Sequence, residues 1–319
     1  MADEVQEMTT ECWCYTTDEG YLLPTLVSAS QLRKQFMGTG IDVIIVYVGP
    51  YTEIVKAAEA AAKNEGIIMI IVPRSFINDG PMIVARLYLG KVLEKAYKYI
   101  TYLDGDTQVV GRVDPLVQAV PRSGSILAAP DIMAIMVGDQ RRQWRDRPAY
   151  FRRIGISSEN HRRYFNSGVL KTSRSDWEAI SRECLDLLKK PVSNEFSFKD
   201  QDALNIILGG NQELISLRWN WPGFLLSTGA EKIVPPQIVH YMSRPRPWDG
   251  PFPPWGKSGN SCYQRFVETY PALRALYRPF TGGRYLRYQA QQLFKGLTEG
   301  YGSADVRNRI EVLEQRARI

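Results

Sequence analysis

Short apolar runs rich in β-branched residues alternate with stretches of helical spacing through the first third of the chain. The apolar runs occupy residues 12–17, 42–48, 67–72 and 99–103. The stretches between them occupy residues 22–36, 52–64 and 82–97. A near-continuous apolar run predicts a strand that is buried on both faces of a sheet. Repeated strand–helix alternation predicts parallel βαβ units, so the sequence indicates an α/β fold with a central, mostly parallel sheet flanked by helices.

The second half of the chain is less regular. Strands are expected at residues 125–129 and 164–170. Helices are expected at four places, residues 175–189, 200–208, 284–295 and 305–318. The proline-rich segment 235–254 contains aromatic residues, which favour an ordered loop over a linker. Because 319 residues allow two domains or one large domain, we predict a catalytic domain over 1–260 and a C-terminal helical extension over 261–319 that faces the acceptor or a membrane.

The composition excludes several classes of protein. Hydrophobic residues make up 44% of the chain and charged residues 23%, as is usual for a soluble globular protein. Four cysteines are too few for a disulfide framework, and Cys12 and Cys14 are expected to face the same side of a strand, buried and reduced. No apolar run approaches the roughly 18 residues of a membrane-spanning helix. Residues 1–11 lack the features of a signal peptide, so a cytoplasmic location is expected.

The net charge of +6 is concentrated in one window of the sequence. Residues 141–163 contain eight arginines and two acidic residues, which accounts for the whole surplus. A local basic patch points to an anionic partner, although a solvated basic loop is the plain alternative. Trp144, Tyr150 and Phe151 lie among the arginines. Arginines beside aromatic rings suit a phosphorylated or acidic sugar, because arginine pairs with anions and the rings can stack on sugar faces. The same composition suits an anionic lipid surface.

Two carboxylates follow the predicted strand at 99–103. Asp104 and Asp106 flank Gly105, which permits the turn that lets both carboxylates reach one cation. Hard oxygen ligands suit Mn²⁺ or Mg²⁺. Short motifs of this kind arise by chance, and Asp200-Gln201-Asp202 is a second one in the same chain. A simple turn is the structural alternative, but the preceding strand places the first pair at the carboxyl edge of the sheet, where ligands bind.

His240 is the candidate third ligand. The chain contains two histidines, and His161 lies among arginines that would repel a cation. His240 follows the short apolar run 237–239 at a predicted strand end. A lone histidine is most often structural, whereas one that completes a site with two carboxylates is a better candidate for a metal ligand.

Six motifs in order give the chain a resemblance to the family-8 retaining glycosyltransferases, the group that includes glycogenin, galactinol synthases and bacterial lipopolysaccharide hexosyltransferases. The resemblance covers about residues 11–250. The motifs are Thr16-Thr17-Asp18-Glu19-Gly20-Tyr21, Ala85-Arg86-Leu87, Leu103-Asp104-Gly105-Asp106, Phe165-Asn166-Ser167-Gly168-Val169-Leu170, Asp200-Gln201-Asp202-Ala203-Leu204-Asn205, and His240-Tyr241 through Arg246-Pro247-Trp248.

The resemblance implies a GT-A fold and transfer of glucose or galactose from UDP-glucose or UDP-galactose with retention of configuration. It implies a Mn²⁺ ion, with Mg²⁺ as the alternative, held by Asp104, Asp106 and His240 and assisting the departure of UDP. The implied donor-binding residues are Thr16, Asp18, Tyr21, Arg86, Asp104, Gly105, Asp106, Ser243 and Arg246. The implied residues around the donor hexose, where catalysis occurs, are Asp131, Asn166, Asp200 and Gln201.

The retaining mechanism stays open at the level of sequence. A double displacement needs a nucleophile opposite UDP, and the best-placed group in the family pattern is Gln201, whose amide oxygen is a poor nucleophile. A front-face route, in which the departing phosphate oxygen takes the acceptor proton, is therefore at least as well supported. Asp200 has a plain alternative as a helix cap. Three departures from the family pattern, at Gly20, Ser243 and Arg246, bear on fine donor specificity.

The acceptor is the least constrained part of the prediction. We expect a saccharide or lipid-linked acceptor, with an anionic one favoured by the basic window, handled at the cytoplasmic face of the inner membrane, and no nucleic-acid partner. The segment after residue 284, with basic and aromatic residues, suits either peripheral contact with a membrane surface or packing on the catalytic domain. Three competing functions are a self-glucosylating enzyme like glycogenin, a non-catalytic polyanion-binding protein, and a nucleotidyltransferase, whose glycine-rich phosphate loop is missing from this sequence.

Overall fold

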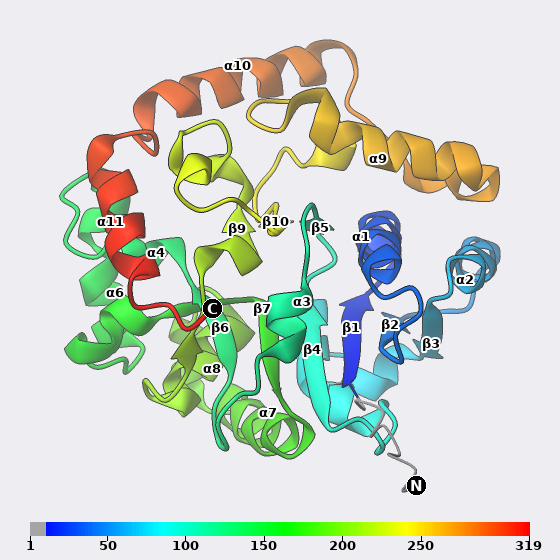
Figure 1. Cartoon of the computed structure of the whole chain (residues 1–319), viewed down its shortest axis with the longest axis horizontal. Helices are drawn as coiled ribbons and strands as arrows, with labels where there is room; N and C mark the ends of the chain where they lie inside the picture. The colour runs from blue at the N-terminus through cyan, green and yellow to red at the C-terminus, as the bar shows by residue number, and fades with distance from the viewer. Residues whose placement is uncertain (1–10) are drawn as a thin grey trace, which may run out of the picture.

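The computed structural model describes residues 11–319. The acidic stretch used for the localisation prediction, residues 1–10, lies outside the described residues. A seven-stranded sheet forms the centre of the molecule, with strand order β3-β2-β1-β4-β7-β6-β8 (Figure 1). Its strands are β1 (Glu11–Thr17), β2 (Asp42–Val48), β3 (Ile68–Val72), β4 (Tyr99–Leu103), β6 (Leu127–Pro130), β7 (Phe165–Ser173) and β8 (Glu213–Leu214).

The sheet is mostly parallel, as the sequence predicts. β1 pairs in parallel with β2 and β4, β2 with β3, and β6 with β8. β7 runs antiparallel to both β4 and β6. The strand predicted at 164–170 is therefore present, but it is inserted in the opposite direction to its neighbours.

Side-chain alternation across the strands divides the core into two layers. Cys12 and Cys14 of β1 belong to one apolar cluster, and Trp13 and Tyr15 belong to the other. The two thiols are free and fully buried, so the prediction that they face one side of a strand is confirmed. Helices α1 (Leu22–Gln35) and α2 (Glu53–Asn64) cover the Trp13 face, and α7 (Arg174–Leu188) and α8 (Lys199–Leu208) cover the Cys12 face (Figure 1).

A buried ion pair links β1 to β7 across β4. The Glu11 carboxylate accepts hydrogen bonds from Lys171 Nζ at 2.8 Å, Thr101 Oγ1 at 2.9 Å and Trp13 Nε1 at 2.7 Å. Glu11 and Lys171 are each 1% exposed. Burial lowers the pKa of Lys171, and the Glu11 charge opposes that shift. Charges buried this deeply are tolerated because each is paired and hydrogen-bonded.

A second, three-stranded sheet lies between the large sheet and the C-terminal helices (Figure 1). It consists of β5 (Thr107–Val109), β9 (Trp221–Pro222) and β10 (Ile238–His240). β10 is antiparallel to β5 and parallel to β9, and the register puts His240 opposite both Thr107 and Pro222. This pairing brings the imidazole to the turn that follows β4.

The C-terminal part forms an arch of helices beyond the small sheet (Figure 1). Its helices are α9 (Gly256–Thr269), α10 (Gly282–Thr298) and α11 (Ala304–Glu314), so the domain boundary predicted at residue 260 falls within α9. The end of the chain returns to the large sheet, where Arg318 N donates to Leu214 O at 3.1 Å and Ser216 N donates to Ile319 O at 3.0 Å. Among residues 11–319, none of the helices has the length and apolar character needed to cross a bilayer.

Several local predictions were wrong. The segment 82–97 forms 3₁₀ turns over Met82–Lys91 and not a long helix, and the final helix ends at Glu314 instead of residue 318. The basic window is not a loop but three short helices, α5 (Arg142–Arg145), α6 (Arg147–Arg153) and a 3₁₀ segment over Ser158–Arg163.

The aromatic residues of the basic window are also placed differently from the prediction. Tyr150 and Phe151 are 6% and 0% exposed, and the Tyr150 hydroxyl donates to Asp202 at 2.6 Å. Rings this deeply buried cannot stack on an acceptor sugar, so the idea that they do is wrong. Their apolar surface packs the short helices onto the core, which explains why a basic segment is ordered.

Candidate active site

Asp104 and Asp106 are held by the turn that closes β4. Asp104 N donates to Gly168 O at 2.8 Å, and Thr107 N donates back to Asp104 O at 3.2 Å. A Cβ on Gly105 would overlap the Thr25 hydroxyl, so the close packing of this turn against α1 requires glycine. The turn points both carboxylates to the same side, as the sequence predicts.

His240 completes a cluster with the two carboxylates. His240 Nε2 lies 3.1 Å from Asp106 Oδ1 and 3.6 Å from Asp104 Oδ2, and one ligand atom from each residue falls within 4.8 Å of the others. His240 Nδ1 lies 2.9 Å from Asn220 Oδ1. Since that oxygen can only accept, Nδ1 carries a proton, and Nε2 is the ring nitrogen that faces the carboxylates.

The donor set fits a divalent cation. Burial alone would lower the pKa of His240, but the charges of Asp106 and Asp104 overcome it and raise the pKa. Carboxylates that favour a proton at this position favour a metal cation as well. Two carboxylate oxygens and one imidazole nitrogen, the latter fixed from behind by an amide, are ligands suited to Mn²⁺.

Arg86 contacts Asp104 through the carboxylate oxygen that does not face His240. Its guanidinium forms ion pairs of 2.8 Å with both Asp104 and Asp200, and it donates to the carbonyl of Ser167. It also lies 4.6 Å above the centre of the Tyr102 ring. Burial opposes the charge of Arg86, but the two carboxylates raise its pKa above the ordinary range. Arg86 therefore fixes one oxygen of Asp104 and leaves the other directed toward His240.

A chain of amide hydrogen bonds connects the cluster to the rest of the site. Asn220 Nδ2 donates to Asn166 Oδ1 at 2.8 Å, and Asn166 Nδ2 donates to Asp131 Oδ2 at 2.9 Å. Gln201 Nε2 donates to the same Asp131 oxygen at 3.2 Å, and Gln201 Oε1 accepts from Ser167 N at 3.1 Å. The orientation of the Gln201 amide is thus determined on both sides, and its oxygen is already engaged.

Asp200 is fully buried and only partly compensated. Burial, with a further contribution from Asp104, raises the pKa of Asp200 to about 7 although Arg86 opposes the shift. Apart from the ion pair with Arg86, its carboxylate oxygens have no hydrogen-bond partner within the described part of the chain. The helix that contains it begins at Lys199, with Phe198 at the cap position, so the alternative role of Asp200 as a helix cap is wrong.

One cavity, which we call the catalytic cavity, is lined by all of the predicted catalytic and metal-binding residues. It has a volume of about 350 Å³. The predicted residues that line it are Arg86, Asp104, Asp106, Asp131, Asn166, Asp200, Gln201 and His240. Its rim adds Trp144, Arg147, Phe198 and Phe224. Of the basic window, Arg147 reaches the cavity together with Trp144, whereas Arg152 and Arg153 do not line it.

Tyr21 and Arg246, two of the predicted donor-binding residues, lie beside this cavity and do not line it. The Tyr21 ring meets the Trp248 ring edge-on at 5.8 Å between centroids, and the Arg246 guanidinium lies 5.0 Å from the centre of Tyr21. Arg246 Nε is 3.7 Å from Asp106 Oδ2. Burial raises the pKa of Tyr21 to about 12. These contacts connect the tyrosine and the arginine to the carboxylate cluster.

Of three more predicted donor-binding residues, two have hydrogen-bond partners within the protein and the third lines a separate hollow. Thr16 Oγ1 lies 3.2 Å from the Tyr102 hydroxyl. Asp18 Oδ1 accepts from Gly20 N at 3.0 Å and caps the turn before α1. Ser243 lines a different hollow, beneath α10. Their roles toward a nucleotide stay predictions.

Asn220 is the residue that sequence reasoning missed. It lies in a 3₁₀ turn over Leu217–Asn220, directly before β9, and supplies the acceptor that sets the His240 tautomer. No local pattern marks it. The one sign available is its position as a polar residue directly before β9, the strand that pairs with the His240 strand β10.

The fold is of the GT-A type: an α/β domain with a mostly parallel central sheet and an acidic cluster at its carboxyl edge. The galactosyltransferase LgtC, solved with donor and acceptor sugar analogs, superposes with a TM-score of 0.63 over 87% of this chain and 99% of that chain, at 20% identity. The glycosyltransferase GlyE of Streptococcus pneumoniae superposes with a TM-score of 0.58 over 85% of this chain and 66% of that chain, at 17% identity.

Residues 12–250 match glycosyl transferase family 8, so the chain belongs to that family. Among curated proteins, the probable galacturonosyltransferase-like 8 of Arabidopsis thaliana is 26% identical over 185 residues, which covers 53% of this chain and 45% of that protein. The probable galacturonosyltransferase-like 9 of the same plant matches to the same extent. The chain thus spans about half the length of the curated relatives it matches.

Proposed function

We propose that the protein transfers a hexose, glucose or galactose, from a UDP-sugar to a saccharide or lipid-linked acceptor with retention of configuration, with Mn²⁺ assisting the departure of UDP. The observation that carries the proposal is the cluster of Asp104, Asp106 and His240, with the imidazole tautomer fixed by Asn220, at the edge of the catalytic cavity. When bound there, the cation would supply Lewis-acid stabilisation of the negative charge on the leaving diphosphate.

The chain's own residues divide the remaining work. Arg246, close to Asp106, adds a fixed positive charge for the diphosphate, and Thr16, Asp18, Tyr21 and Ser243 are proposed to contact the nucleotide. Arg86 keeps Asp104 in place rather than moving toward the donor, because it is held by ion pairs with Asp104 and Asp200 at once.

The donor hexose is proposed to lie against Asp131, Asn166, Asp200 and Gln201. The carboxylate of Asp200, engaged only with Arg86, can still accept from the hydroxyl groups of a sugar. Gln201 Oε1 already accepts from the Ser167 amide, which makes it a poor nucleophile. This favours the front-face route, in which the acceptor loses its proton to the departing phosphate oxygen and Gln201 positions the sugar.

A hexuronate donor, UDP-galacturonate, is the second candidate. Arg147 lines the catalytic cavity, and its charged end meets the Trp144 ring at 5.8 Å and the Gln143 carbonyl at 3.3 Å. A guanidinium without a carboxylate partner among residues 11–319 is suited to bind the carboxylate of an acidic sugar. The curated relatives named as galacturonosyltransferase-like support the same candidate.

The decisive test combines nucleotide binding with a donor screen. UDP plus Mn²⁺ at 100 times its dissociation constant should stabilise the protein by about 2.7 kcal/mol, and Asp104→Ala should abolish the gain. Hydrolysis of UDP-glucose, UDP-galactose and UDP-galacturonate, each with Mn²⁺, then identifies the donor. Arg147→Gln should lower the use of UDP-galacturonate selectively if the second candidate holds. No stabilisation in the native protein, or equal stabilisation in Asp104→Ala, would contradict the proposal.

The same screen distinguishes transfer to a separate acceptor from self-glucosylation and from simple polyanion binding. Intact mass after incubation with UDP-glucose reveals hexoses added to the protein itself, as a self-glucosylating enzyme requires. Hydrolysis of any of the three donors excludes a purely polyanion-binding protein.

Peripheral contact with a membrane is proposed for α10. Leu286, Leu293 and Phe294 are 68%, 54% and 67% exposed on this helix, which also carries Arg287 and Lys295. Exposed apolar residues beside basic ones suit an anionic lipid surface. Sedimentation with phosphatidylglycerol vesicles, compared with phosphatidylcholine vesicles, tests this. Replacing the three apolar residues by serine should abolish the sedimentation, and unchanged sedimentation would contradict the proposal.

A further inference from the structure

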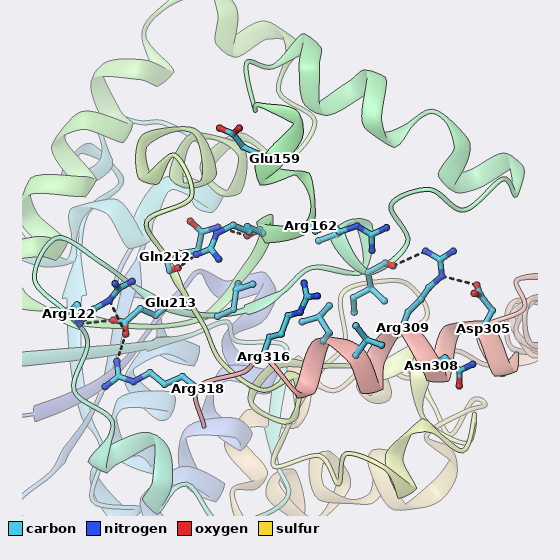
Figure 2. A pocket seen from close by; sticks show the side chains of 16 residues that line it. Arg122, Glu159, Arg162, Gln212, Glu213, Asp305, Asn308, Arg309, Arg316 and Arg318 are labelled. Carbon is cyan, nitrogen blue, oxygen red and sulfur yellow. Dashed lines mark hydrogen bonds and ion pairs between the residues drawn. The ribbon is translucent and has the colours of Figure 1, made fainter.

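A second cavity, larger than the catalytic one, lies along α11 (Figure 2). It has a volume of about 740 Å³, is open to solvent on one side, and is lined by residues of α11, β8 and the 3₁₀ segment Ser158–Arg163. It shares no lining residue with the catalytic cavity. The two are separated by α4 (Ile132–Ile135): Ile132 and Met133 line the catalytic cavity, and Ala134 and Ile135 line this one.

The charged residues of this cavity leave a positive surplus. The arginines that line it are Arg122, Arg162, Arg163, Arg309, Arg316 and Arg318. Against these stand Glu159, Glu213 and Asp305. Glu213 pairs with both Arg122 and Arg318, and Asp305 pairs with Arg309 at 2.8 Å. The existing ion pairs therefore account for only part of the positive charge.

Arg162, Arg163 and Arg316 remain, and none of them lies within ion-pair distance of a carboxylate in the part of the chain that the structure describes. The Arg163 guanidinium already donates to the carbonyls of Gly210 at 3.0 Å and Gln212 at 2.6 Å, so Arg162 and Arg316 are the two candidates for binding a ligand. Figure 2 shows the Arg316 side chain rising from the end of α11 into the hollow, on the side where Gln212 and Arg162 lie. Two guanidinium groups without carboxylate partners at one cavity form a site for an anion.

Gln212 indicates that a ligand in this cavity must also donate a hydrogen bond. Its side chain is 2% exposed, and its Nε2 donates to the carbonyl of Arg163. Its Oε1 has no hydrogen-bond partner among residues 11–319. An amide oxygen can only accept a hydrogen bond, so an anion alone does not satisfy it. A ligand that carries both an anionic group and hydroxyl groups satisfies the arginines and the glutamine together.

We infer that this cavity is a binding site for an anionic sugar, with the phosphate or carboxylate held by Arg162 and Arg316 and a hydroxyl group donating to Gln212. The volume is within the range of small-molecule sites and accommodates one or two sugar units. The inference goes beyond the proposed function, because the site lies apart from the acidic cluster and needs neither the metal nor the nucleotide.

Calorimetric titration of the full chain, without metal or nucleotide, tests the inference. The probes are glucose 6-phosphate, digalacturonate, inorganic phosphate and galactose. At least one of the two anionic sugars should bind, galactose should not, and inorganic phosphate should bind more weakly than the anionic sugar. Binding of glucose 6-phosphate alone or of digalacturonate alone identifies the anionic group. Absence of binding by both, or inorganic phosphate binding as tightly as the sugars, overturns the inference.

Matched variants locate the binding. Arg162→Gln combined with Arg316→Gln should weaken the anionic sugar about tenfold or more, because two charge-assisted contacts are lost. Arg182→Gln combined with Arg265→Gln removes the same charge from exposed positions on α7 and α9 and should leave the affinity unchanged. Equal affinity in the first pair and the native protein, or equal loss in both pairs, overturns the inference. Retained binding of UDP plus Mn²⁺ by the first pair separates this outcome from failure of the proposed function.

Discussion

Gly168 gives the sharpest test of the metal site, because its missing side chain makes room for His240. A Cβ built at this position would lie well inside 3.0 Å of both Cε1 and Nδ1 of the imidazole. It would also lie 2.9 Å from Asn166 Oδ1. Gly168 is in β7, where β-sheet geometry allows any residue, so the conflict in Gly168→Ala is with the imidazole and not with the backbone.

The size of the effect follows from the distances. Ordinary contact with a Cβ begins at 3.4 Å, so the imidazole must retreat by more than 0.4 Å. A metal–ligand bond tolerates a deviation of only about 0.2 Å. His240 therefore cannot both clear the methyl group and keep its place in the cluster. Perturbing an outer partner of a metal ligand costs about 10–100-fold in metal affinity. Displacing the ligand itself should therefore weaken Mn²⁺ binding by about 100-fold or more, and a 100-fold loss corresponds to about 2.8 kcal/mol of binding free energy.

The assay is calorimetric titration of Mn²⁺ in the presence of UDP, with circular dichroism to check that the variant is folded. Gly283→Ala is the matched control, because a Cβ there meets nothing within 4 Å and the residue has no positive φ. The control should bind Mn²⁺ as the native protein does. If folded Gly168→Ala also binds Mn²⁺ with native affinity, then His240 is not a ligand and the site is wrongly assigned.

Three further predictions concern the surroundings of the site and the core. Asn220→Ala frees the imidazole to rotate and should weaken Mn²⁺ binding by about 10–100-fold. Asn211→Ala, which removes an exposed amide just before β8, should not, and the same titration measures both. Lys171→Met leaves Glu11 buried without its cation and should lower the free energy of unfolding in urea by about 3–5 kcal/mol. Adding Glu11→Gln should recover much of that loss, and a double variant no more stable than the single one would contradict the pairing. Asp200 has a pKa raised from 3.8 to about 7, so folding favours its protonated form, and stability should fall as pH rises through that interval. In Asp200→Asn this pH dependence should be absent from urea unfolding curves recorded with a chelator. Identical pH dependence in the native protein and the variant would show that the pKa of Asp200 is not raised.

The parts of the fold that sequence predicts are those whose signal is local. Strands β1, β2 and β4 are each marked by a run of apolar residues, because a strand covered on both faces needs apolar side chains on both. A similar run marks β3, but β3 is the edge strand of the sheet and Ile68 is 43% exposed, so the prediction that this strand is buried on both faces is wrong. The direction of β7 carries no such signal, since apolar alternation reads the same for either orientation. β8 and β9 have two residues each, which is too short for any periodicity, and their pairing depends on chain far away in sequence.

The same distinction separates the predicted site residues from the missed one. Asp104 and Asp106 are recognised because two carboxylates follow a buried strand, and His240 because the chain has one other histidine. Asn220 acts through contacts with Asn166 and His240, which are 54 and 20 positions away. The error over Tyr150 and Phe151 has a related cause: composition reports that aromatics lie among arginines, but not which side of a short helix faces the core.

The charges around the cluster explain why a cation belongs in it. Asp104, Asp106 and Asp200 face Arg86 and Arg246, so the set has one more carboxylate than guanidinium. Arg86 is shared between two of the carboxylates at 2.8 Å each, whereas Arg246 stands 3.7 Å from the third. The deficit of positive charge is therefore located at Asp106 and the free oxygen of Asp104, where His240 presents Nε2. A divalent cation held there by these three residues would change the balance from negative to positive, and a net positive site would favour the diphosphate of the proposed donor.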